Sequence, residues 1–200
     1  MALRKTLPSL PEDSWRGRLL RPHFGRQVNA RLARLARREH PPLIRLNQRL
    51  RHRPITRLFR RVSRLGDGPA WYALMAALLA TQGTAALAAV LHMMLAGLAG
   101  TLLYKWLKGA TERPRPYQAE PAIQCLTAPL DRFSFPSGHT LHAVIFSLVV
   151  TAYYPLLAWV VFPFTALVAA SRLILGLHYP SDVVAGALLG ALVAWLSFGI

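Results

Sequence analysis

Ionisable side chains gather in three clusters at the ends of apolar segments, and the first cluster holds two cations. Lys108 and Arg115 are separated by six residues, directly after a long apolar segment. Two cations at this spacing can close on one phosphate, Lys as a point charge and Arg as a planar bidentate donor. Taken alone, the pair is also typical of basic residues that anchor a membrane helix at the interface.

The second cluster, Pro136-Ser137-Gly138-His139, stands where another apolar segment begins. A helix N-terminus offers free backbone N–H groups and the positive end of the helix dipole, so it suits an anion. Gly138 lets the backbone approach a ligand closely, and Ser137 adds either a hydroxyl donor or an N-cap. His139 can pass a proton to a leaving group near neutral pH, although a lone His here is often a capping or packing residue.

The third cluster runs from Ser171 to Asp182. Arg172 ends an apolar segment, where a cation without an anion is costly. Asp182 follows His178 by four residues, so its carboxylate can accept a hydrogen bond from one imidazole nitrogen. The other nitrogen is then oriented and more basic, as a nucleophile requires. A structural His–Asp pair at a turn explains the same spacing equally well.

The three clusters share one position relative to the apolar segments. Residue 108 ends a segment, residue 139 begins the next, residue 172 ends one and residue 182 begins the last. Helices that alternate in direction would bring all these ends to one side of a membrane. We therefore expect the three clusters to meet in one site.

In these residues the sequence resembles the type 2 phosphatidic acid phosphatase superfamily. The signature of that superfamily has three parts, Lys-x6-Arg-Pro, Pro-Ser-Gly-His and Ser-Arg-x5-His-x3-Asp. All three match in order and spacing, at Lys108 to Pro116, Pro136 to His139 and Ser171 to Asp182. Residues 66–200 carry the resemblance, and the basic N-terminal part lies outside it.

The resemblance implies a role for each motif residue. His178 would attack phosphorus and form a phosphohistidine, Asp182 would orient His178, and His139 would protonate the leaving oxygen and then activate water. The phosphoryl oxygens would be held by Lys108, Arg115, Arg172, Ser137 and the Gly138 amide. The implied enzyme needs no metal and no cofactor, and the sequence has no cluster of acids or histidines with metal-ligand spacing.

Three further residues near the motifs invite interpretation. Arg113 and His142 lie beside motif residues without belonging to the signature. His142 comes one turn after His139, and it either lines the pocket or packs in the bundle. We expect His92, inside an apolar segment, to be a buried polar packing residue.

Five apolar segments follow a break at Gly66 to Pro69, at residues 69–82, 84–107, 139–154, 155–175 and 181–200. Residues 84–107 would rise about 36 Å as a helix, enough to cross a bilayer, whereas residues 69–82 are marginal for a span. We see no internal repeat and no alternating strand pattern. The sequence predicts an all-α integral membrane bundle of about five transmembrane helices. Bacterial members of the superfamily typically resemble a six-helix bundle, and here an Arg-rich stretch takes the place of the first helix.

The first third of the chain is strongly basic. Residues 1–66 hold 18 of the 24 Lys and Arg residues against three acids, which leaves a charge of +15 from a total of +16. Seven Arg in residues 43–62 oppose insertion, at roughly 2.5–3.5 kcal/mol each at a helix centre, so an amphipathic helix on the membrane surface, broken by Pro54, fits better. Residues 1–27, with several Pro and Gly, are predicted to be irregular.

We therefore divide the chain into a basic arm, residues 1–65, and a transmembrane phosphatase domain, residues 66–200. The arm is predicted to bind anionic lipids, with a simply solvated basic arm as the alternative. The apolar segments exclude an ordinary soluble nucleic-acid-binding protein. The sequence indicates no oligomeric state.

The basic arm also bears on location. Basic segments stay in the cytoplasm, and five spans would put the arm and the three clusters on the same side. We expect a multi-pass protein of the bacterial inner membrane with a cytoplasm-facing site, and the side reverses if residues 69–82 do not span.

The expected substrate is a lipid phosphate monoester or diphosphate, of the phosphatidylglycerol phosphate, phosphatidic acid or undecaprenyl pyrophosphate type. Two other functions stay open at this point. Vanadate-dependent haloperoxidases resemble the same signature but are soluble. A non-enzymatic protein that binds anionic lipids would use the basic arm, but the intact set of catalytic residues argues against it.

Overall fold

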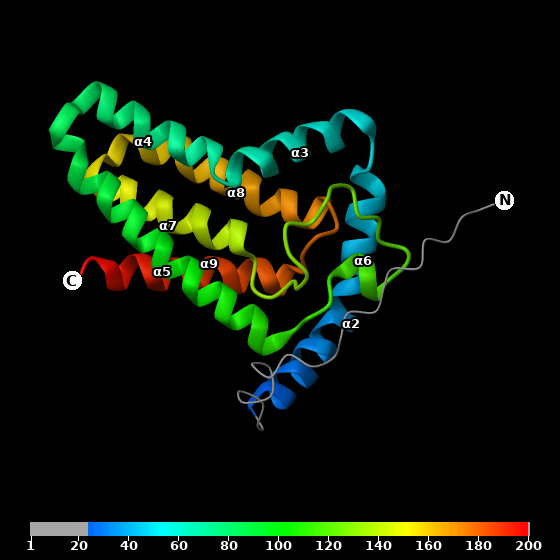
Figure 1. Ribbon diagram of the computed structural model, residues 1–200. Coiled ribbons are helices and arrows are strands. Elements are labelled where there is room, and N and C mark those ends of the chain that lie inside the picture. Colours follow the sequence, from blue (N-terminus) through cyan, green and yellow to red (C-terminus); the bar gives the residue numbers. More distant parts are fainter. Residues whose placement is uncertain (1–23, 200) are drawn as a thin grey trace.

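The computed structural model describes residues 24–199, and every regular element in that range is helical, as predicted (Figure 1). The α-helices are α2 (Phe24–Leu50), α3 (Arg53–Gly66), α4 (Pro69–Gln82), α5 (Leu87–Thr111), α6 (Pro116–Ala119), α7 (Gly138–Tyr153), α8 (Ala158–Ile174) and α9 (Pro180–Ser197). Two 3-10 turns, η1 (Gly83–Ala86) and η2 (Pro155–Leu157), close the α4–α5 and α7–α8 hairpins.

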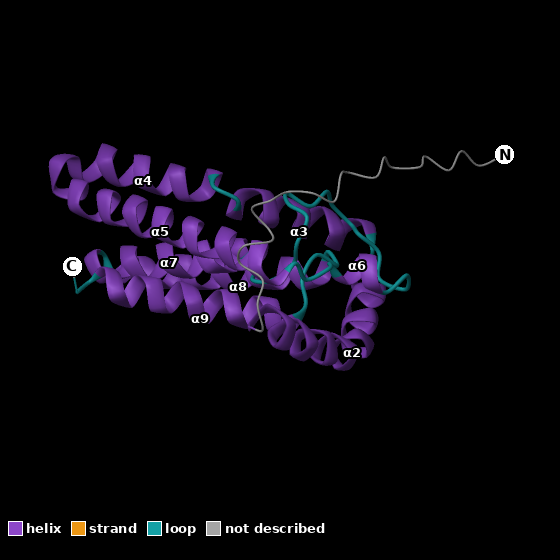
Figure 2. Ribbon diagram, turned by 60° about the horizontal axis from the view of Figure 1, so that its bottom comes forward, coloured by secondary structure: helices purple, strands orange, loops and turns teal. Residues whose placement is uncertain are grey.

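Five of these helices, α4, α5, α7, α8 and α9, form the bundle and coincide with the five predicted apolar segments. Helix α7 lies at its centre and packs against α5, α8 and α9 (Figures 1 and 2). The hairpins make successive helices run in opposite directions. The alternation that the sequence analysis assumed is therefore present.

The outer faces of the bundle are those of a membrane protein. Large apolar side chains are exposed along them, including Leu95 at 66%, Leu102 at 63% and Trp159 at 84%. Three helical stretches are long and apolar enough to cross a bilayer, namely Pro69–Ala119, which contains the α4–α5 hairpin, Pro155–Ile174 and Pro180–Ser197. Helix α7 is apolar but shorter. The count of about five spans stays a prediction.

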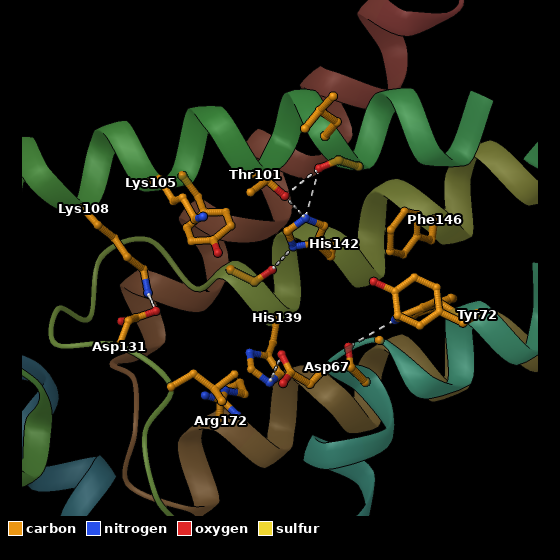
Figure 3. A pocket seen from close by; sticks show the side chains of 18 of the residues that line it. Asp67, Tyr72, Thr101, Lys105, Lys108, Asp131, His139, His142, Phe146 and Arg172 are labelled. Atoms are coloured by element: carbon orange, nitrogen blue, oxygen red, sulfur yellow. Dashed lines mark hydrogen bonds and ion pairs between the residues drawn. The ribbon is translucent and has the colours of Figure 1, made fainter. Parts of the chain in front are cut away.

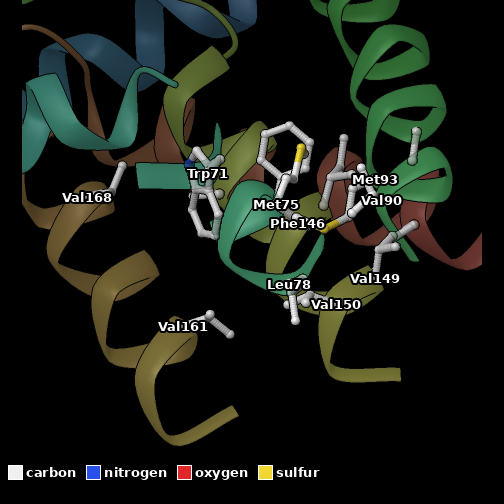
Figure 4. Packing of buried hydrophobic residues seen from close by; sticks show 14 of the residues in the cluster. Trp71, Met75, Leu78, Val90, Met93, Phe146, Val149, Val150, Val161 and Val168 are labelled. Carbon is white, nitrogen blue, oxygen red and sulfur yellow. The ribbon is translucent and has the colours of Figure 1, made fainter. Parts of the chain in front are cut away.

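The apolar core lies between α4, α5, α7 and α8 (Figure 4). Trp71 is its largest member, and its indole N–H donates to the Gly66 carbonyl at 3.2 Å, which fixes the junction between α3 and α4. Around it pack Met75, Leu78, Val90, Met93, Phe146, Val149, Val150, Val161 and Val168. This packing ties α4 to the helices that carry the motifs.

Glycines set the closest helix contacts. A Cβ added at Gly186 of α9 would lie 2.5 Å from the Ser137 carbonyl oxygen, and one at Gly190 would lie 2.5 Å from that of Leu141. Only residues without a side chain let two backbones approach so closely. The N-terminal ends of α7 and α9, which carry the second and third motifs, are thereby held together.

The N-terminal helices depart from the prediction in detail. Helix α2 begins at Phe24, so residues 24–27 are helical rather than irregular, and residues 1–23 lie outside the described part of the chain. The break predicted at Pro54 is present: α2 ends at Leu50 and α3 begins at Arg53, with Pro54 in its first turn, where the missing N–H costs nothing. Helix α2 crosses the end of the bundle, and α3 packs along α8 (Figures 1 and 2).

Candidate active site

The three clusters meet at the end of the bundle that α2 crosses, around a cavity of about 510 Å³. Six of the eight predicted site residues line this cavity: Lys108, Arg115, Gly138, His139, Arg172 and His178. The other two, Ser137 and Asp182, have no exposed surface and are not among the lining residues. The convergence expected from alternating helices is therefore observed.

Ser137 is the N-cap of α7, which was one of its two predicted roles. Its Oγ accepts a 3.5 Å hydrogen bond from the Thr140 N–H and lies 3.0 Å from the Thr140 Oγ1. Its backbone N–H donates to the Asp182 carbonyl at 3.0 Å, which joins α7 to α9. At Gly138 an added Cβ would lie 3.4 Å from the Tyr104 ring. A direct contact of the Ser137 hydroxyl with phosphate stays a prediction.

Lys108 and Arg115 close on one carboxylate. Lys108 Nζ lies 2.6 Å from Asp131 Oδ2, and Arg115 Nη2 donates to Asp131 Oδ1 at 2.8 Å. Burial would raise the pKa of Asp131, but the hydrogen bond and charge of Lys108, followed by the charge of Arg115, outweigh burial and lower it below 3.8. Asp131 was not predicted from the sequence, since it lies in the polar loop outside every motif. Its carboxylate shows that the two cations can bind one anion together.

His178 lies in the turn between α8 and α9 and is 1% exposed. Its Nδ1 is 3.5 Å from Asp182 Oδ2, while its Nε2 is 3.5 Å from Arg115 Nη1. The nitrogen that faces Arg115, one of the predicted phosphate-binding cations, is therefore Nε2. Burial, then the positive charges of Arg172 and Arg115, hold the pKa of His178 well below 6.5. The imidazole is neutral at neutral pH, as a nucleophile must be.

Asp182 stands in the first turn of α9 and has no exposed surface. Its Oδ2 accepts a 2.9 Å hydrogen bond from the Tyr179 backbone N–H, and its Oδ1 accepts one from Arg113 Nη1. The carboxylate is thus fixed on both oxygens beside His178. Arg113, which the sequence analysis noted only as a neighbour of the motif, is its cationic partner.

His139 faces a second carboxylate. Its Nε2 lies 3.3 Å from Oδ1 of Asp67, which sits in the break between α3 and α4 and lines the cavity. Burial raises the pKa of Asp67 above 3.8, while Arg172 opposes that rise. Asp67 was read in the sequence only as part of a helix break. An acid between two glycines at the start of an apolar segment is the signal that could have identified it.

The cavity has a charged end and an apolar end (Figure 3). Lys108, Asp131 and Arg172 lie at the first, and Arg172 Nη1 donates to Ser63 Oγ of α3. Apolar and aromatic side chains of α4, α5 and α7 line the second, namely Trp71, Tyr72, Met75, Met94, Leu98 and Phe146. Tyr72, Met94 and Leu98 are 68%, 57% and 57% exposed on the bundle surface. The cavity therefore continues as an apolar groove between α4 and α5.

Two histidines of the bundle that lie outside the signature, His92 and His142, form hydrogen bonds to neighbouring helices. His142 lines the cavity and also packs, with Nδ1 2.9 Å from the Gly138 carbonyl and Nε2 3.1 Å from the Gly97 carbonyl. Both alternatives for His142 are therefore true. His92 lies in the first two turns of α5, half-buried, with Nε2 2.7 Å from Ser197 Oγ and Nδ1 3.1 Å from the Tyr153 hydroxyl. It is a polar packing residue, as predicted, but it is only partly buried, so the predicted burial is wrong.

The sequence model of the PAP2 superfamily matches residues 85–200. The chain belongs to the PAP2 superfamily. The resemblance drawn from the three motifs is confirmed, and this membership accounts for an all-helical membrane bundle with the motifs at one end. Residues 24–66, which contain α2, α3 and the whole described part of the basic arm, lie before the matched region.

Other PAP2 proteins resemble the chain over different lengths. The Bacillus licheniformis bacitracin transport permease protein BcrC is 29% identical over 109 residues, and the undecaprenyl-diphosphatase BcrC of Bacillus subtilis is 28% identical over 109 residues. These matches span 54% of this chain and 54% and 56% of the two relatives, so the chain matches about half the length of each.

Two solved structures match more of the fold. The crystal structure of Aquifex aeolicus LpxE has a TM-score of 0.68 and 28% identity, covering 80% of this chain and 94% of that one. The PAP2 type phosphatidylglycerolphosphate phosphatase of Bacillus subtilis has a TM-score of 0.65 and 25% identity, covering 80% and 83%. The PAP2 fold thus extends beyond the segment that the sequence model matches.

Proposed function

We propose that the protein is a metal-independent membrane phosphatase that hydrolyses a lipid phosphate monoester or diphosphate through a phosphohistidine at His178. One observation carries the proposal: a buried imidazole has its Nε2 3.5 Å from Arg115 Nη1, in a cavity that Lys108 and Arg172 also line and that opens into an apolar groove. The cations suit a phosphoryl group, and the groove between α4 and α5 suits the hydrocarbon chain of a lipid. The printed names of the undecaprenyl-diphosphatase and phosphatidylglycerolphosphate phosphatase relatives support this substrate class.

The residues divide the reaction into two steps. In the first, His178 Nε2 forms a bond to phosphorus while the bond to the lipid oxygen breaks, and that oxygen takes a proton from His139. In the second, water attacks the phosphohistidine, His139 takes its proton, and inorganic phosphate leaves with His178 restored. Lys108, Arg115 and Arg172 stabilise the charge on the phosphoryl oxygens throughout.

The decisive measurement is phosphate release by the detergent-purified protein from a panel of lipid phosphates and diphosphates, in EDTA. We expect release that is insensitive to EDTA and lost in His178→Ala. A phosphorus label that stays on the acid-quenched wild-type protein, but not on His178→Ala, would identify the phosphohistidine. A folded wild-type protein that releases nothing from the whole panel would refute the proposal and favour a lipid-binding role.

In the proposed orientation, the protein lies in the bacterial inner membrane and the site faces the cytoplasm. It is supported by α2 and α3, whose exposed Arg residues lie at the same end of the bundle as the cavity. The single cysteine, Cys125, is exposed in the loop between α6 and α7, which also lies at that end. A membrane-impermeant maleimide should therefore label Cys125 only in opened cells. Leu156→Cys with Cys125→Ser, at the far end, should be labelled in intact cells, and the reverse pattern would refute this orientation.

The basic arm, residues 1–65, is proposed to bind anionic lipids through its exposed faces, while the three motifs lie in residues 66–200. Helix α3 exposes Arg57, Arg61 and Arg64, together with Leu58 and Leu65. Such a face suits an interface, where each basic residue contributes about 1 kcal/mol next to anionic headgroups. Replacing the three Arg by Gln should raise the apparent KM on anionic vesicles and leave it unchanged on zwitterionic ones. Equal effects on both would refute lipid binding by this face.

A further inference from the structure

Helix α2 reaches the catalytic centre through an ion-pair network that the three motifs do not include. Arg113 donates from Nη1 to Asp182 Oδ1 and from Nη2 to Glu39 Oε2 at 3.1 Å. The side chains of Arg113, Asp182 and Glu39 are 3%, 0% and 12% exposed. One buried guanidinium therefore bridges a carboxylate of α2 and the carboxylate beside the proposed nucleophile.

Glu39 also binds the start of α9 directly. Its Oε1 accepts a 2.7 Å hydrogen bond from the Ser181 backbone N–H, and its Oε2 accepts one from the Ser181 hydroxyl at 2.8 Å. Free N–H groups and the helix dipole favour a carboxylate at this place. Glu39 is the one acid between residues 24 and 66, among many Arg. A basic arm that only binds a membrane surface would not require an acid at this position, so the contacts of Glu39 indicate a separate role.

Tyr179, the residue after His178, is held between the same two elements. The Arg113 guanidinium lies 4.0 Å from the centre of the Tyr179 ring, and His40 of α2 stacks on that ring with Nε2 3.2 Å from the hydroxyl. The backbone N–H of Tyr179 donates to Asp182. Helix α2 thus supports the turn that carries His178 as well as the carboxylate beside it.

Helix α2 is anchored at a second point, about two helical turns beyond these contacts. The Asn47 side chain is fully buried, and its Nδ2 donates to the Ile174 and Gln124 carbonyls at 3.0 and 3.1 Å. Its Oδ1 accepts from the Gln124 N–H at 3.0 Å, and Leu43 is buried nearby. These are the contacts of a packed structural element and not of a loosely attached arm.

The geometry points to Glu39 and Arg113 as positioning residues: Glu39 fixes Arg113, Arg113 fixes the Asp182 carboxylate, and Asp182 orients His178. Asp182 Oδ2 lies 3.5 Å from His178 Nδ1, within ion-pair distance, and Nδ1 has no hydrogen-bond partner among the described residues. The orientation of the imidazole therefore depends on how firmly this carboxylate is held. Helix α2 is then part of the catalytic unit. The inference rests on the proposed attack by His178.

The test compares Glu39→Gln and Arg113→Gln with Arg38→Gln, which removes a charge from an exposed position of the same helix. The substrate is a short-chain, water-soluble lipid phosphate, so that membrane binding does not contribute. We expect kcat to fall about 10-fold for Glu39→Gln and about 100-fold for Arg113→Gln, the range known for small displacements of catalytic groups. KM should stay within about twofold, since Lys108, Arg115 and Arg172 are untouched.

Two further variants separate positioning from loss of structure. The double variant Glu39→Gln/Arg113→Gln should be no slower than Arg113→Gln alone, because Glu39 acts through Arg113. Arg113→Lys should recover part of kcat, since it keeps the charge, but not all of it, since a single ammonium replaces the two nitrogens that bridge Asp182 and Glu39. If Arg113→Gln does not fold, the kcat of Glu39→Gln and of Arg113→Lys decides.

The outcomes are distinct. Wild-type kcat in both single variants, or a rise in KM alone, would overturn the inference. If His178→Ala is inactive in the same assay, the proposed phosphatase function still stands. Additive losses in the double variant would show that Glu39 does not act through Arg113, and would also overturn it. A wild-type protein without activity would overturn the proposed function and this inference together.

Discussion

Gly186→Ala is the change whose effect follows most directly from the structure. The added Cβ would lie 2.5 Å from the Ser137 carbonyl oxygen, about 0.9 Å inside the ordinary contact limit of 3.4 Å. The obstructing atom belongs to the backbone at the start of α7, so no side-chain rotation relieves the clash. Helix α9, which carries Asp182, must therefore move away from α7, which carries His139.

The size of the effect follows from that displacement. Separating catalytic groups by about 1 Å can cost about 100-fold in rate, and overpacking costs about 1–3 kcal/mol in stability. We expect kcat on a short-chain lipid phosphate to fall about 100-fold, with a lower Tm. The matched control is Gly109→Ala in α5, where an added Cβ meets nothing within 4 Å. It should keep kcat and raise stability slightly, by up to about 1 kcal/mol.

The assay is phosphate release by purified, folded protein, with thermal unfolding measured on the same preparation. Gly186→Ala with wild-type kcat and wild-type Tm would refute the argument that this contact sets the distance between the two motif-bearing helices. A lower Tm with unchanged kcat would show that the bundle absorbs the added methyl group without moving the site.

Two more predictions concern the carboxylates in the cavity. Asp67→Asn should lower kcat about 10-fold with KM nearly unchanged, because Asp67 contacts His139 and no phosphate-binding cation within ion-pair distance. The pH profile of kcat should also move with this substitution. A change confined to KM would contradict the prediction. Asp131→Asn should lower the inhibition constant of inorganic phosphate severalfold, because the carboxylate that pairs with Lys108 and Arg115 loses its charge. Weaker inhibition by phosphate would show instead that Asp131 holds the two cations in place.

The sequence was informative where spacing and helix direction together determine position. His139 and Arg172 stand at segment ends, and alternating helices must bring such ends together, so their convergence could be predicted. The same holds for Lys108 and His178. Regular helices transmit position along the chain, which makes this kind of inference reliable for the motifs.

The residues that were missed lie where no such regularity operates. Asp131 belongs to a loop, and its contact with Lys108 is a product of tertiary folding. Glu39 is surrounded in sequence by Arg, so its local composition indicates a solvated basic face, and only the docking of α2 reveals its buried contacts. Arg113 was visible beside the first motif, but the sequence could not show that its partner lies in the third.

The charges in the cavity also bear on turnover. Three cations, Lys108, Arg115 and Arg172, line the space where a phosphoryl group would bind, and two of them are already paired with the single carboxylate of Asp131. A phosphate entering the site must displace that carboxylate, which weakens ground-state binding while keeping the cations in place between turnovers. In the proposed mechanism, the same carboxylate can return when phosphate is cleaved from the phosphohistidine, and this return favours product release. An enzyme raises kcat when it binds substrate and product weakly and uses its cations fully in the transition state. If Asp131 acts in this way, removing its charge should tighten phosphate binding and slow release in the same variant.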